Sequence, residues 1–200
     1  MVINEEWSVA EKKFLVKKCL NEGCMNFLQY GRQHWRSKDI KIISNNCPNL
    51  KQLMMDTNMN ASMQSWPVLV APWTSLEYLN LHMCPKFGGM FEGVQLHLTL
   101  PNLAKIFLTE DGKYNQDERT PSFLPDLEGC GKLKTAIFLH GFFCFKDDIV
   151  PGEKLPFPIG LTKLNLMGSK FHDEYMNNVT YVEIKKVLPE LENFGPCKKP

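Results

Sequence analysis

The sequence lacks the features that would assign it to a membrane or to nucleic acid. No apolar stretch approaches the roughly 20 residues that a membrane-spanning helix requires, and the first residues, MVINEEWSVAEKKF, lack the apolar core of a secretory signal. With 23 basic and 22 acidic residues, the formal net charge is only +1, which argues against a groove that follows phosphates. We therefore expect a protein of the cytoplasm or nucleus, with no membrane span and no nucleic-acid partner.

Motifs for catalysis and for metal binding are also missing. The seven cysteines include no Cys-x-x-Cys pair, and His140 with Cys144 is an isolated i, i+4 pair, whereas a structural zinc site needs four convergent ligands. No Gly-x-Ser-x-Gly sequence marks a nucleophile, and no Gly-Lys-Ser/Thr completes a phosphate loop. These absences predict a non-enzymatic protein without a cofactor, whose cysteines are reduced and mostly buried.

What the sequence does contain is an internal repeat. The repeated pattern is an apolar residue, then two turn residues, then Leu-x-x-Leu-x-apolar. It occurs clearly at Cys47–Met55 and at Leu100–Leu108. Looser copies begin at Trp73, Cys130, Pro158 and Leu188, and an earlier one fits at Met25–Tyr30. The first residue of each Leu-x-x-Leu core falls at Leu50, Leu76, Leu103, Leu133, Leu161 and Leu191, with Met25 at the corresponding place in the earliest copy.

The spacing of these residues sets the class of fold. The step is about 25 to 30 residues, close to the period of roughly 20 to 29 of leucine-rich repeats, and Asn58 and Cys84 occupy the Asn/Cys position of that consensus. Seven copies in phase predict an α/β fold, a right-handed leucine-rich-repeat solenoid with a curved parallel sheet. We expect one domain over 1–200, with an N-terminal cap at 1–24, about seven repeats at 25–194 and a frayed tail at 195–200.

The segments between the strands differ in their expected structure. Helices are predicted at 8–20, at 37–46 and at 173–188. The first begins with a capping-box pair, Ser8 and Glu11, and is expected to cover the open end of the solenoid. In the last of these, Tyr181, Ile184 and Leu188 recur at helical spacing on one face. The other returns contain glycine or proline and are expected to be short turns and extended stretches rather than full helices.

The run Ser37–Leu50 resembles the repeat of F-box leucine-rich-repeat proteins. In that subtype a short helix ends in Cys-Pro-x-Leu, as at Cys47–Leu50, while Cys130 lies three residues before Leu133 and Cys84 follows its strand. The resemblance is specific only over 37–55 and 76–84, and no F-box helical module precedes the first strand. It implies recruitment of a protein substrate to a cullin-type ubiquitin ligase. Leucine-rich cullin adaptors and mitochondrial assembly factors are alternative families.

In such a repeat the leucines point into the core, and the residues between them point outward from the sheet. This alternation predicts three rows across the strands, beginning at Phe27, Gln29 and Gly31. Aromatic residues and methionine on this face are typical of protein contacts. The predicted partner-binding residues are Met54, Tyr78, Asn80, His82, Lys105, Phe107, Ile137, Leu139, Lys163 and Asn165.

The sequence therefore predicts a protein-binding module that holds a protein partner on its concave face. The leading hypothesis, by resemblance, is the substrate-recruiting part of a ubiquitin ligase. The alternative is a scaffold or assembly factor with no link to ubiquitin.

Overall fold

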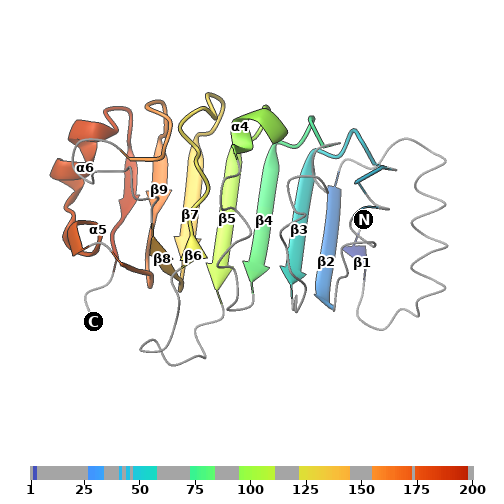
Figure 1. Ribbon diagram of the computed structural model, residues 1–200, viewed down its shortest axis with the longest axis horizontal. Coiled ribbons are helices and arrows are strands. Elements are labelled where there is room, and N and C mark those ends of the chain that lie inside the picture. Colours follow the sequence, from blue (N-terminus) through green and yellow to red (C-terminus); the bar gives the residue numbers. More distant parts are fainter. Residues whose placement is uncertain are drawn as a thin grey trace.

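The computed structural model describes residues 2–3, 27–33, 41, 44–45, 47–57, 73–83, 95–110, 122–144, 155–172 and 174–197. Its main feature is a parallel sheet of eight short strands (Figure 1). In spatial order these are β1 (Val2–Ile3), β2 (Phe27–Gln33), β3 (Gln52–Thr57), β4 (Tyr78–Met83), β5 (Lys105–Glu110), β7 (Thr135–Leu139), β9 (Lys163–Asn165) and β11 (Asn193–Gly195). The spatial order is the chain order, so each strand pairs with the strands of the neighbouring repeats.

The repeated leucines begin each strand with the same turn. From Leu50 to Leu191, the backbone amide of the leucine donates to the carbonyl three residues earlier, at 2.9–3.1 Å. The first turn residue is buried in all six copies, and proline, which suits the second position of a turn, occupies it at Pro48, Pro101 and Pro189. The six leucines are Leu50, Leu76, Leu103, Leu133, Leu161 and Leu191, and each is at most 1% exposed.

A second repeated device joins one repeat to the next. The carbonyl of the residue after each leucine accepts two backbone amides from the following repeat. The carbonyl of Lys51, for example, accepts from Glu77 at 2.8 Å and from Tyr78 at 3.0 Å. The same double acceptance recurs at Glu77, Ala104, Lys134 and Thr162. This joint fixes the register in which adjacent strands enter the sheet.

The returns add a second, smaller layer. Parts of three successive returns, β6 (Ser122–Phe123), β8 (Phe142–Cys144) and β10 (Lys170–Phe171), pair in parallel as a three-stranded sheet. Phe138 of β7 meets the ring of Phe143 of β8 at 5.9 Å and that of Phe157 at 6.0 Å. The core therefore lies between the eight-stranded sheet and the returns, where dispersion and removal of apolar surface from water stabilise it.

Three short helices lie within the described part of the chain after β4. α4 (Leu96–Thr99) is a single turn, in a return that we expected to hold short turns and extended stretches rather than a full helix. The predicted helix over 173–188 is two helices, α5 (Glu174–Asn178) and α6 (Tyr181–Val187). Thr180 separates them because its hydroxyl and the Glu183 carboxylate form a capping box that starts α6 afresh.

Other expectations need correction or lie outside the described residues. Gly195, assigned to the tail, pairs with Asn165 in the sheet, and Cys197 is buried in the core. Tyr181 is 41% exposed, whereas Ile184 and Leu188, which share its helical spacing, are buried. The first strand of the repeat begins at Phe27 in the described residues, and β1, which was not predicted, pairs with it. The predicted helix at 8–20 lies outside the described residues, as does most of the helix at 37–46, of which Lys41, Ser44 and Asn45 are helical.

Candidate binding surface

The two faces of the eight-stranded sheet differ in burial. Leu53, Leu79, Ile106, Ala136 and Leu164 occupy one register position across the strands, and each is 0% exposed within the hydrophobic core. The residues before and after them point to the opposite side. We call this opposite side the open face, because its described side chains are mostly half-buried or exposed and none belongs to the core cluster.

The strand register brings the open-face residues into three rows. The first row is Phe27, Gln52, Tyr78, Lys105, Thr135, Lys163 and Asn193. The middle row is Gln29, Met54, Asn80, Phe107, Ile137, Asn165 and Gly195. The third row is Asp56, His82, Thr109 and Leu139, in which Asp56 is placed by its backbone alone. The structure thus brings all ten sequence-predicted binding residues together on one face in the predicted order.

An aromatic pair lies in the middle of this face. The rings of Tyr78 and Phe107 have centroids 5.3 Å apart and are tilted by 51°, a separation at which aromatic pairs attract each other. The Asn80 side-chain amide donates to the Tyr78 hydroxyl at 3.2 Å, which orients the tyrosine ring. Tyr78, Asn80 and Phe107 are all half-buried, so their outer surfaces stay accessible on the open face.

Two of the predicted residues differ from the expectation of a freely exposed side chain. Ile137 is only 6% exposed, although it does not belong to the core cluster. The Asn165 side-chain oxygen accepts the Met167 amide at 3.0 Å, and it lies so close to Gly195 that a Cβ there would clash with it. The Asn165 side chain therefore folds over the glycine of the last strand and closes the middle row at its C-terminal end.

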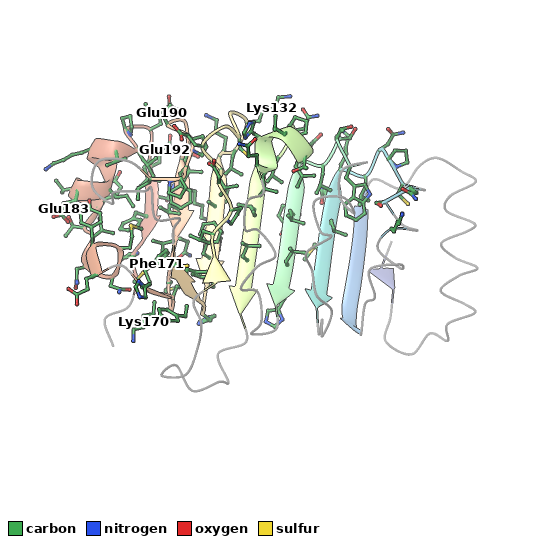
Figure 2. The ribbon with its side chains drawn as sticks, in the orientation of Figure 1. Lys132, Lys170, Phe171, Glu183, Glu190 and Glu192 are labelled. Carbon is green, nitrogen blue, oxygen red and sulfur yellow. The ribbon has the colours of Figure 1, made fainter. Side chains whose placement is uncertain are left out.

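Charged residues border the sheet along the turns. Lys51 pairs with Glu77 at 3.1 Å, and Lys134 lies 3.6 Å from Glu190 and donates to the Gly160 carbonyl. Asn102 donates to the Thr74 carbonyl at 2.7 Å and accepts from Lys132. Figure 2 shows Lys132, Glu190 and Glu192 along this edge and Lys170 at the opposite edge. Sequence reasoning treated these positions only as turns, although their spacing matches that of the repeats.

Two buried cysteines have thiols with raised pKa values. Burial raises the pKa of the Cys130 thiol to about 12, with the Asp126 carboxylate adding to the effect, and burial likewise raises the pKa of Cys197 to about 11. Both thiols are therefore neutral at physiological pH, and a neutral thiol is a poor nucleophile. Within the described part of the chain, no three His, Cys, Asp or Glu side chains gather to hold a metal ion.

Comparison with known proteins gave no relative. No protein-family model, curated protein or solved structure matches this chain. Every helix in the described ranges is too short or too polar to cross a bilayer. Any account of the function therefore depends on the geometry of the open face.

Proposed function

We propose that this protein is a leucine-rich-repeat solenoid that binds another protein through the open face of its parallel sheet. The observation that carries the proposal is the half-buried Tyr78 and Phe107 pair, which lies between repeats on the side of the sheet away from the core. Aromatic side chains supply much of the energy of protein contacts because they cover a large area at low cost in conformational entropy. The sequential strand order and the six repeated turns support the solenoid.

The leading biological role is recruitment of a protein substrate to a cullin-type ubiquitin ligase in the cytoplasm or nucleus. The support for this role is the resemblance of Ser37–Leu50, and of the cysteines at 84 and 130, to the repeats of F-box leucine-rich-repeat proteins. The second candidate is a scaffold or assembly factor that uses the same face without ubiquitin. Both candidates need the open face, and only the first needs a connection to a cullin.

The test compares the wild-type protein with the double variant Tyr78→Ala/Phe107→Ala. Affinity purification from cells and mass spectrometry would identify proteins that the wild type captures reproducibly. We expect the double variant to retain its fold and to lose at least about 10-fold of that capture, because removal of two central aromatic contacts commonly costs more than 1 kcal/mol each.

A matched control is Leu98→Ala/Ile159→Ala, which removes two apolar side chains that are 68% and 69% exposed and lie outside the sheet. Equal capture by wild type and both variants would rule out the open face as the binding surface. Recovery of a cullin with the wild type would favour the ligase role, and a stable complex that lacks a cullin would favour the scaffold.

A further inference from the structure

We propose that the open face recognises a segment of its partner in which acidic side chains lie beside apolar ones. This inference rests on the proposed function, because it assigns a chemistry to the ligand of the same face. Two observations carry it: the position of Lys105 and Lys163 in the first row, and the half-buried aromatic pair Tyr78 and Phe107 next to them.

The two lysines form a basic site within the first row. Lys105 pairs in register with Thr135, and Thr135 pairs with Lys163, so the lysine backbones are two strand spacings, or roughly 9.6 Å, apart. Both side chains are exposed, and Thr135 lies half-buried between them. A lysine carries its charge at the end of a flexible four-carbon stem, so both ammonium groups can reach one acidic segment that crosses Thr135.

The charges of this site are not neutralised by neighbouring described groups. Lys51 and Lys134, on the turns, each lie within ion-pair distance of a glutamate, whereas neither Lys105 nor Lys163 has such a partner among the residues that the structure describes. The described side chains next to the two lysines include no carboxylate, and Asp56 of the third row lies on β3, two strands away from Lys105. The local charge around Lys105 and Lys163 is therefore positive, which favours an acidic partner and speeds its encounter.

The apolar part of the surface adjoins the charges directly. Tyr78 is the register neighbour of Lys105 in the first row, and Phe107 is the neighbour of Ile137 in the middle row. The Tyr78 and Phe107 rings are already held against each other, so little side-chain freedom is lost when a ligand covers them. An apolar side chain over this pair would place adjacent carboxylates beside Lys105 and Lys163.

The composition of the face favours carboxylates over phosphates. Phosphate recognition commonly uses the bidentate fork of arginine, and the described rows contain lysine but no arginine. A nucleic acid would need a longer basic track than two lysines, and the whole chain carries a net charge of only +1.

The experiment is a selection of peptides from a random 14-residue library displayed on phage, with the full chain as bait. Wild type is compared with Lys105→Glu/Lys163→Glu and with the control Lys132→Glu/Lys186→Glu, which changes the net charge equally. We expect wild type and control to enrich peptides with Asp or Glu beside Phe, Leu, Ile or Trp. The variant Lys105→Glu/Lys163→Glu should bind those peptides at least about 10-fold more weakly and should enrich basic peptides instead.

The outcomes separate this inference from the proposed function. Peptides that show no acidic preference, but are lost with Tyr78→Ala/Phe107→Ala, would overturn the inference and leave the proposed function standing. Enriched peptides that bind all variants equally, or no enrichment at all, would overturn both. Each selected peptide is also made with phosphoserine in place of every Asp or Glu and with its other residues unchanged. Tighter binding of the phosphorylated peptides would overturn the choice of carboxylate and would show that the lysines prefer phosphate.

Discussion

The two faces of the eight-stranded sheet are made by alternate residues of the same strands, yet they obey different constraints. On the core face, Leu79, Ile106 and Leu164 are 0% exposed and share one chemical type. On the open face, one row passes from tyrosine through lysine and threonine to lysine. Burial against the returns restricts the first set to apolar side chains of suitable volume. Among the described residues no such layer packs over the second set, so its composition is free to vary and could serve recognition.

The sharpest way to test this contrast is to shorten the same residue type on each face. Phe138→Ala should lower the free energy of unfolding by about 3 to 5 kcal/mol, because Phe138 is 0% exposed and its loss leaves a cavity between Phe143 and Phe157. Phe107→Ala, on the neighbouring strand, should cost about 1 kcal/mol, because only part of its ring area is removed from water. Urea unfolding followed by circular dichroism measures both, and equal losses would show that the faces do not differ as described.

A second change tests the close contact between Asn165 and Gly195 at the C-terminal end of the open face. Gly195→Ala would bring its Cβ into steric conflict with the Asn165 side-chain oxygen, so we expect the free energy of unfolding to fall by about 1 to 3 kcal/mol from overpacking. Adding Asn165→Ala should recover most of the loss, because the clashing atom is then absent. Thermal unfolding of the two single variants and the double variant gives the coupling between the positions. Additive losses would show that the two residues do not meet.

A third change, at the start of α6, lies outside both faces of the sheet and gives a reference value for the loss of a local hydrogen bond. Thr180→Ala removes the cap of α6 and should cost about 1 kcal/mol. Hydrogen bonds from the Thr180 backbone and side chain hold the pKa of Glu183 below its ordinary value. The contribution of this carboxylate is therefore present above its unfolded-state pKa and is lost as the pH falls through the folded-state value.

The wild-type protein should consequently lose more stability than Thr180→Ala when the pH is lowered from 7 to 3. Thermal unfolding at a series of pH values tests this difference, with Thr162→Ala as a control threonine outside the cap. A parallel decline of wild type and Thr180→Ala would contradict the assigned role of the capping box.

The smallest effect is expected at the turns. Lys134→Ala removes the contacts of Lys134 with Glu190 and with the Gly160 carbonyl. Both charged side chains are more than half exposed, so the loss should stay below about 0.5 kcal/mol, and 0.5 M salt should reduce it further. A loss comparable to that of Phe107→Ala in the same unfolding assay would mean that the turn contacts matter as much as the open-face rings.

The leucine spacing was sufficient to predict the repeat strands and their register from β3 to β9, because a period of two fixes which residues share a face. It did not predict β1, or the register shift between Tyr30 and Gln33 where β2 meets β3. The pairing of β6, β8 and β10 was not predictable, since it depends on how successive returns happen to meet. The Thr180-x-x-Glu183 capping box was legible in the sequence and was missed inside an apparently continuous helical pattern. Gly195 and Cys197 were misassigned because a Gly-Pro sequence suggested a tail, although the strand pairing of Gly195 and the burial of Cys197 are tertiary effects.

The carbonyls that each accept two amides between neighbouring repeats affect how such a chain can gain or lose repeats during evolution. Every joint is made between one unit and the next, from backbone groups alone, so it does not depend on which side chains a unit carries or on how long its return is. A unit could be duplicated or deleted, and the strands on either side would meet through the same two bonds. Length is thus a variable that this architecture can alter without redesigning any existing part.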